Sequence, residues 1–178
     1  ASLQPFFVAP IRSLCESLNE VLERKIPEVV TMVSASQVAA IKNSWGDIAA
    51  GDGGASVGVD MFVRYFAANP SMKTVFGYTG SPEHLRHNRK LQSHGRKVME
   101  QLGLAISEID DMGRMTGTLK SLGIRHKAFG DIKSEYFPPL GVALLAAMEA
   151  KVGSKLDKGA WGAAYKAISD AIIAGIHA

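Results

Sequence analysis

Two histidines carry the chemistry that this sequence can offer. His94 lies close to an apolar helical stripe in LQSHGRKVMEQLG, and His126 ends the stretch LKSLGIRH. The chain between them is long enough to fold back, so the two rings could face each other across a cavity. Two imidazoles placed in this way could hold the two sides of a flat metal macrocycle, one bonding iron and the other facing a bound gas. His94 by itself is more typical of a half-buried, hydrogen-bonded histidine.

The common catalytic patterns are absent from the sequence. It contains no Gly-rich phosphate loop, no helix with two histidines around a glutamate and no Gly-x-Ser-x-Gly elbow. Its one cysteine, Cys15, excludes an intrachain disulfide and an all-cysteine zinc site. We expect Cys15 to be an inert buried thiol rather than an intermolecular bridge, and the protein to be cytoplasmic. No signal peptide is evident, although one already removed, and hence secretion, stays open.

Composition favours a single globular domain with an additional element. The chain has 178 residues, of which 47% are hydrophobic and 21% charged, and a formal net charge of +3. The densest basic stretch, residues 86–97, lacks the interleaved aromatic residues of a single-strand nucleic-acid surface, so we expect no nucleic-acid partner. The apolar run at 142–148 is far shorter than the roughly 20 residues that span a bilayer, so no transmembrane segment is expected.

The elements that must position the histidines are all helical, because apolar residues recur at spacings of three and four and sustained alternation is missing. A helix over 11–30 is ended or kinked by Pro27. The next helix is capped by Ser34 or Ser36, and the helix that carries His94 is expected from about Pro82 to about Gly103. The remaining expected helices are 57–70, a less regular one over 107–126, one over 132–153 with a kink or late start at its two prolines, and 157–178.

From residue 34 to 178 the sequence resembles a globin. Trp45 in AIKNSW is similar to the tryptophan of the globin A helix. Pro70 and Phe76 in VDMFVRYFAANPSMKTVF are similar to the start of the C helix and to the aromatic residue that wedges against the haem. His94 in SHGRKVM matches the distal histidine, and His126 in LGIRHKAFGDI the proximal iron ligand. YFPPLG adds a weaker similarity to molluscan and other invertebrate globins.

The resemblance implies an all-α globin fold, a three-over-three helical sandwich with a short or absent D helix, and haem b as cofactor. It makes His126 the proximal ligand, with its other ring nitrogen donating to a nearby backbone carbonyl. His94 would either donate a hydrogen bond to the bound gas or occupy the sixth iron site. Apolar residues are expected to line the haem pocket: Phe62, Phe76, Val98, Leu122, Ile132, Phe137 and Leu140.

Other residues receive weaker roles. Phe62 stands where many globins have leucine and would crowd the ligand, while Lys97 and Arg125 are candidate partners of the haem propionates or plain surface cations. We expect three methionines in the core rather than on iron, and three further histidines on the surface. These are Met99, Met112 and Met115, and His84, His87 and His177.

The expected function is reversible binding of dioxygen for storage or transport. Alternatives are a haem enzyme, either a nitric oxide dioxygenase or a peroxidase-like protein, and a gas or redox sensor in which His94 bonds the resting iron. The chain shows no flavin or nicotinamide module, so an enzyme is the less favoured reading. The expected partners are dioxygen and other diatomic gases.

Residues 1–33 have no counterpart in a minimal globin and are expected to form a separate helical extension. Its apolar stripe could pack on the globin domain, pair in a homodimer or dock on a membrane, in that order of preference. The acidic residues Glu16, Glu20 and Glu23 disfavour an anionic membrane surface.

Overall fold

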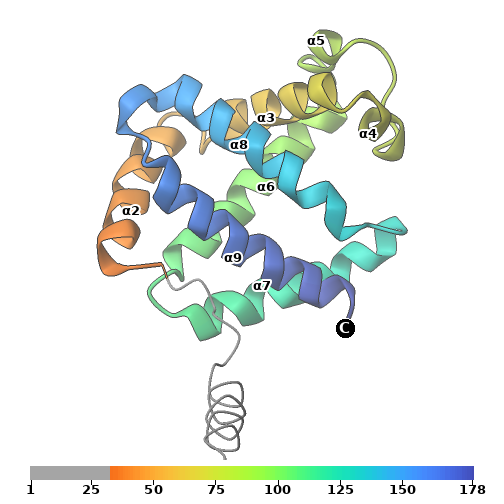
Figure 1. The fold of residues 1–178 in the computed structure, drawn as a ribbon. Helices are drawn as coiled ribbons and strands as arrows, with labels where there is room; N and C mark the ends of the chain where they lie inside the picture. Colours follow the sequence, from red (N-terminus) through yellow and green to blue (C-terminus); the bar gives the residue numbers. More distant parts are fainter. Residues whose placement is uncertain (1–32) are drawn as a thin grey trace, which may run out of the picture. The chain divides into compact units, whose positions relative to one another are not determined.

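A computed structural model describes residues 33–178, and these form helices and turns without a strand (Figure 1). The helix expected over 11–30 and the fate of the extension lie outside the described residues, and the division of the chain at residue 33 stays a prediction. The helices are α2 (Ala35–Ala49), α3 (Ala55–Ala68), α4 (Pro70–Val75), α5 (Pro82–Leu85), α6 (Arg89–Ser107), α7 (Met112–His126), α8 (Phe137–Val152) and α9 (Lys158–Ile176). Short 3₁₀ turns occupy Lys127–Phe129, Ser134–Tyr136 and Gly153–Lys155.

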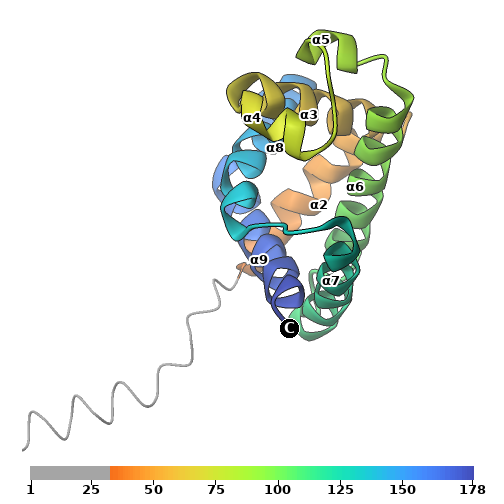
Figure 2. The same ribbon diagram turned by 90° about the vertical axis from the view of Figure 1, so that its right-hand side faces the viewer.

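The helices pack in two layers. α3 packs against α6 and α8, and α7 packs against α9. Figure 2 shows α6 and α7 on one side of the fold and α8 with α9 on the other. α2 completes the packing by contacting α6, α8 and α9. The all-α sandwich expected from the sequence is therefore confirmed, and the expected short D-helix region is the single turn of α5.

Side-chain caps set where several helices begin. Ser34, rather than Ser36, caps α2: its hydroxyl accepts from the amide of Gln37 at 3.3 Å, and its own amide donates to the Gln37 side chain at 2.9 Å. Asp111 accepts from the amide of Arg114 at 3.0 Å and so fixes the start of α7. Each cap satisfies a backbone donor that the first helical turn leaves unpaired.

The prediction of one helix from Pro82 to Gly103 is wrong. Ser81 caps a helix at Pro82 as expected, but this helix ends after one turn. Asn88 then starts a new helix, because its side-chain oxygen accepts from the amides of Lys90 and Leu91 at 2.9 and 3.2 Å. α6 continues past Gly103 to Ser107, since Gly103 faces the ring of Trp45 instead of ending the helix.

Two further expectations are settled by the helix ends. The segment at 107–126 is not irregular: after a turn it forms the regular helix α7, which ends at His126. Pro138 and Pro139 give α8 a late start rather than a kink, because prolines are tolerated in a first helical turn whose amides would be unpaired anyway. α8 ends at Val152, and Gly153, which has a φ of +60°, follows as its cap.

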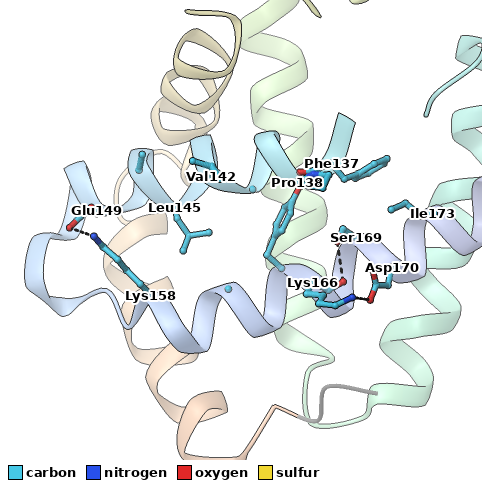
Figure 3. A pocket seen from close by; sticks show the side chains of 14 residues that line it. Phe137, Pro138, Val142, Leu145, Glu149, Lys158, Lys166, Ser169, Asp170 and Ile173 are labelled. Atoms are coloured by element: carbon cyan, nitrogen blue, oxygen red, sulfur yellow. Dashed lines mark hydrogen bonds and ion pairs between the residues drawn. The ribbon is translucent and has the colours of Figure 1, made fainter. Parts of the chain in front are cut away.

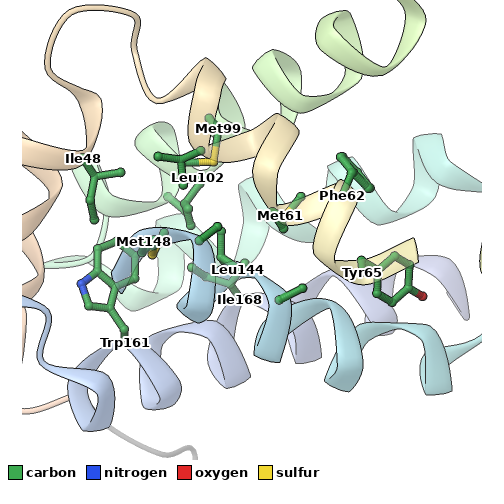
Figure 4. Close-up of a cluster of buried hydrophobic side chains, with 14 of the residues drawn as sticks. Ile48, Met61, Phe62, Tyr65, Met99, Leu102, Leu144, Met148, Trp161 and Ile168 are labelled. Carbon is green, nitrogen blue, oxygen red and sulfur yellow. The ribbon is translucent and has the colours of Figure 1, made fainter. Parts of the chain in front are cut away.

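The core at the α2 end of the fold is built around two tryptophans. Trp161 is 1% exposed, and its indole N–H donates to the hydroxyl of Ser44 at 2.8 Å. The ring centroids of Trp45 and Trp161 lie 6.3 Å apart. Figure 4 shows Trp161 among apolar side chains from several helices, including Ile48, Leu102 and Met148.

The methionine and surface-histidine predictions are confirmed. Met99 and Met115 are buried in the core and Met112 packs against it, while His84, His87 and His177 are exposed. Across residues 33–178, no helix combines the length and apolar character needed to cross a bilayer.

Candidate haem site

His94 lies on α6 between two phenylalanine rings. The centroid of its imidazole is 4.7 Å from that of Phe62 on α3 and 5.9 Å from that of Phe76, which follows α4. Burial lowers the pKa of His94, and positive charge on His126 and Lys97 lowers it further. The ring is therefore neutral at pH 7, with one N–H and one lone pair.

A close helix crossing places His94. A Cβ built on Gly58 of α3 would lie 2.4 Å from the carbonyl oxygen of Gly95, and a Cβ on Gly95 would lie 2.9 Å from the backbone of Gly58. Only two residues without side chains allow the backbones of α3 and α6 to touch in this way. Since Gly95 follows His94 directly, this contact fixes the position of His94 relative to Phe62.

His126 ends α7 with a hydrogen bond that orients its ring as a metal ligand needs. Its Nδ1 lies 2.9 Å from the backbone oxygen of Leu122, one helical turn earlier. Because a carbonyl can only accept, Nδ1 carries a hydrogen, so the neutral form of the ring has its lone pair on Nε2. The hydrogen bond expected for a proximal histidine is thus present, and it leaves Nε2 free to bond a metal.

A second glycine crossing places His126. A Cβ on Gly123 of α7 would lie 2.1 Å from the carbonyl oxygen of Ile172, and a Cβ on Gly175 of α9 would lie 2.1 Å from that of Lys120. The backbones of α7 and α9 are therefore in contact one turn before His126. Each histidine stands within one turn of a glycine contact that holds its helix against a neighbour.

The two histidines are coupled electrostatically. Burial is the main cause of the lowered pKa of His94, and the charged form of His126 lowers it further. A neutral imidazole with a free Nε2 on one side and a second neutral imidazole between apolar rings on the other suit a haem iron with a gas-binding face. The side chains present therefore fit haem.

The other predicted pocket residues lie in varied surroundings. Phe62 is 1% exposed, and its ring lies 5.8 Å from that of Phe76. Phe76, Val98, Leu122 and Leu140 are half-buried and pack against the core, and Ile132 is half-buried in the connection before α8. Lys97 and Arg125 are exposed. Phe137 is half-buried and lines a groove between α8 and α9.

Sequence reasoning missed two features of the site. Phe66, Tyr65 and Tyr78 extend the aromatic cluster beyond Phe62 and Phe76, with ring centroids 5.5 to 6.1 Å apart along the cluster. The glycine crossings were also missed, although a readable signal existed. Glycine inside a helix costs about 1 kcal/mol relative to alanine, so glycines within apolar helical stretches indicate a close packing contact.

Two tyrosines hold the start of α8 in place through hydrogen bonds to its backbone. The phenol of Tyr65 donates to the backbone oxygen of Tyr136 at 3.2 Å, and that of Tyr165 to the backbone oxygen of Phe137 at 2.7 Å. Burial raises the pKa of both phenols, so each stays a hydrogen-bond donor. Tyr65 also packs on Phe66 and thereby joins the aromatic cluster to the connection that follows His126.

Comparison with known proteins identifies this arrangement. Residues 59–172 match the globin family. The chain is 52% identical over 145 residues to "Globin, major polymeric component P1" and 54% identical over 145 residues to "Globin, polymeric component P3", both from Glycera dibranchiata. Each match covers 82% of this chain and 98% of the relative. These relatives come from an annelid, consistent with the invertebrate resemblance in the sequence.

Two more distant proteins are also similar to this chain, one in sequence and one in fold. A neuroglobin of Chaenocephalus aceratus is 31% identical over 116 residues, covering 64% of this chain and 71% of that protein. The crystal structure of a hexacoordinated haem protein from an anhydrobiotic tardigrade superposes with a TM-score of 0.73 at 18% identity, covering 82% of this chain and 96% of that one. These matches show that the chain belongs to the globin family, whose cofactor is haem b.

Proposed function

We propose that this globin binds dioxygen reversibly, with His126 as the proximal iron ligand and His94 facing the gas. The observation that carries the proposal is the hydrogen bond from His126 Nδ1 to the backbone oxygen of Leu122, which leaves Nε2 free for iron. When bound, haem iron supplies the site at which a diatomic gas attaches.

The distal residues favour a polar gas in a dry site. Phe62 and Phe76 flank the half-buried His94 with apolar rings and so lower the polarity of its surroundings. A neutral His94 can donate one N–H to a ligand that carries partial negative charge, and the low local dielectric strengthens that bond. His94 thus selects dioxygen over less polar gases.

The remaining predicted pocket residues keep their roles as part of this proposal. Val98, Leu122, Ile132, Phe137 and Leu140 would cover the faces of the macrocycle, and Lys97 and Arg125, both exposed, would pair with its propionates. A cytoplasmic location remains a prediction from the single cysteine. The enzyme alternatives remain predictions as well.

A resting state in which His94 bonds the iron is the second candidate. It is favoured by the neutral state of His94, since burial between Phe62 and Phe76 disfavours its charged form and the neutral ring keeps a lone pair for a metal. The visible spectrum of the ferrous, gas-free protein separates the two. A single broad high-spin band supports an open gas site, whereas a sharp pair of low-spin bands supports His94 on the iron.

The proximal role is tested by replacing His126 with glycine. We expect His126→Gly to lose haem affinity and to regain its spectrum on addition of free imidazole, which can occupy the space left by the ring. His177→Gly, at an exposed histidine, serves as the matched control. Retention of haem at full affinity by His126→Gly without imidazole would contradict the assignment.

We also propose that the chain self-associates, because the Glycera relatives that are 52% and 54% identical to it over 145 residues are described as polymeric components. A homodimer through residues 1–33 remains a prediction, since residues 1–32 lie outside the described part.

A further inference from the structure

Tyr65 connects the gas-facing side of the site with the part of the chain that follows His126. Its side chain is 1% exposed on α3, and its ring centroid lies 5.6 Å from that of Phe66 and 6.1 Å from that of Phe76. The ring of Phe76 in turn lies 5.9 Å from that of His94. Because buried side chains are closely packed, the ring of Tyr65 can shift only together with the aromatic cluster beside His94.

The hydroxyl of Tyr65 reaches a different part of the fold. It donates to the backbone oxygen of Tyr136 at 3.2 Å, 71 residues further along the chain. Tyr136 closes the connection formed by residues 127–136, which begins directly after His126 and in which every residue except Ile132 and Tyr136 is exposed. A segment with so little buried surface depends on its two ends for its position. One end is held by α7, and the other by the start of α8 and the hydroxyl of Tyr65.

The hydrogen bond from Tyr65 to Tyr136 is one that the fold keeps. Burial raises the pKa of Tyr65, so its hydroxyl stays protonated at neutral pH and can only lose its acceptor by movement. A buried hydroxyl without an acceptor is unfavourable. A displacement of the aromatic cluster therefore draws the backbone of Tyr136 with it.

We propose that Tyr65 is a positioning residue that couples the gas-facing side of the site to the orientation of His126. A ligand that displaces Phe76 moves Tyr65 and, through Tyr136, the connection that begins one residue after His126. Tyr65 thus acts through its two neighbours and not by contact with the gas. The inference rests on the proximal role of His126 proposed above and adds a residue that adjusts it.

Tyr65→Phe tests the coupling, because it removes the hydroxyl and keeps the ring that packs on Phe66. Tyr165→Phe is the matched control. The hydroxyl of Tyr165 donates to the backbone oxygen of Phe137, next to Tyr136, at 2.7 Å. Tyr165 and Phe137 line a groove of about 630 Å³ between α8 and α9, whose lining includes neither histidine (Figure 3). The control therefore loses a comparable hydrogen bond at the start of α8 from a residue on α9.

The iron–histidine stretching band in resonance Raman spectra reports on His126. It is recorded on the full haem-loaded chain just after photolysis of the carbon monoxide complex. We expect Tyr65→Phe to shift this band and Tyr165→Phe to leave it at the parental frequency. The amides of Ile132 and Tyr136, which are hydrogen-bonded within the connection, should exchange with solvent about tenfold faster in Tyr65→Phe than in the parent.

Phe66→Leu supplies a second test, because it loosens the aromatic cluster without changing Tyr65 or a histidine. It should shift the band in the parent and shift it less in Tyr65→Phe, in which the hydrogen bond to Tyr136 is absent.

Two results would overturn the coupling and leave His126 as the proximal ligand. One is a band that Tyr65→Phe leaves unchanged or that Tyr165→Phe shifts equally. The other is a shift by Phe66→Leu that is the same with and without the hydroxyl of Tyr65. A band that persists in His126→Gly without imidazole would overturn the proximal role and the coupling together.

Discussion

Gly58 and Gly95 bring the backbones of α3 and α6 into contact at the residue next to His94. The contact explains why a glycine, a poor helix former, stands within each helix. It also means that the position of His94 depends on the absence of two side chains. The site can therefore be perturbed without changing any residue that touches the cofactor.

Gly95→Ala should destabilise the protein by about 1 to 3 kcal/mol, because its methyl group would overlap the backbone of Gly58 and force the helices apart. Urea unfolding measures the loss. Gly117→Ala, on α7 with open space around its Cβ, should instead be neutral or stabilising by up to about 1 kcal/mol. Equal stabilities for the two variants would show that α3 and α6 separate freely.

His94→Leu should leave haem bound and speed dioxygen dissociation by about 10- to 100-fold, the loss expected for a hydrogen bond of about 1.5 to 3 kcal/mol to a charged acceptor. Flash photolysis and stopped-flow mixing measure the rates. His87→Leu, at an exposed histidine after α5, should leave them unchanged. An unaltered dissociation rate in His94→Leu would remove the hydrogen bond from the mechanism.

Phe62→Leu should speed the association of gases several-fold, since its ring is buried and lies 4.7 Å from His94. The smaller side chain opens space beside the ligand position at a stability cost of about 1 kcal/mol or more. Phe129→Leu is the control, because Phe129 is 79% exposed although its ring lies 6.0 Å from His126. Association rates for carbon monoxide, which accepts hydrogen bonds poorly, separate this steric effect from that of His94.

Asp60→Asn should lower stability at neutral pH by about 1 to 2 kcal/mol, because Asp60 accepts from Arg64 at 2.6 Å and from Arg86 at 2.8 Å. Burial raises the pKa of Asp60, but the two arginines outweigh it and hold the pKa below its usual range. A depressed carboxyl pKa contributes stability above the unfolded value of about 3.9, and this is lost as the pH falls through the folded value.

The difference in unfolding free energy between the parent and Asp60→Asn should therefore be constant from pH 7 to about 5 and shrink below about 4. Urea titrations across this range measure it. Asp47→Asn, which breaks an ion pair with Lys155 in which both side chains are about half exposed or more, should cost less. A difference in unfolding free energy that grows as the pH falls would contradict the lowered pKa of Asp60.

Local chemistry in the sequence predicts much of the fold. The cap of α2, the late start of α8 and the end of α7 at His126 all follow from residues within a few positions of the boundary. The break between α5 and α6 was not predicted, because Asn88 was not recognised as a helix cap. An asparagine before an apolar helical run is a start signal as strong as serine.

Some features of the candidate site could likewise be predicted from the sequence, and others could not. The hydrogen bond of His126 to Leu122 is predictable because a spacing of four puts one residue above the other on a helix. The placing of Phe62 and Phe76 beside His94 needed the family resemblance, since three separate segments meet there. The α8–α9 groove was invisible in the sequence, because its depth depends on which small residues two helices bring together.

The contact between Trp45 and Trp161 limits what intrinsic tryptophan fluorescence can report about folding. The sequence holds two tryptophans, and both lie in the α2 end of the core, with ring centroids 6.3 Å apart and Trp161 donating to Ser44. Intrinsic tryptophan fluorescence therefore reports when α2 packs against α9 and against Gly103 of α6, and neither tryptophan lies on α7. A refolding study that aims to learn whether the helix that carries His126 assembles before the cofactor arrives will need a label on α7.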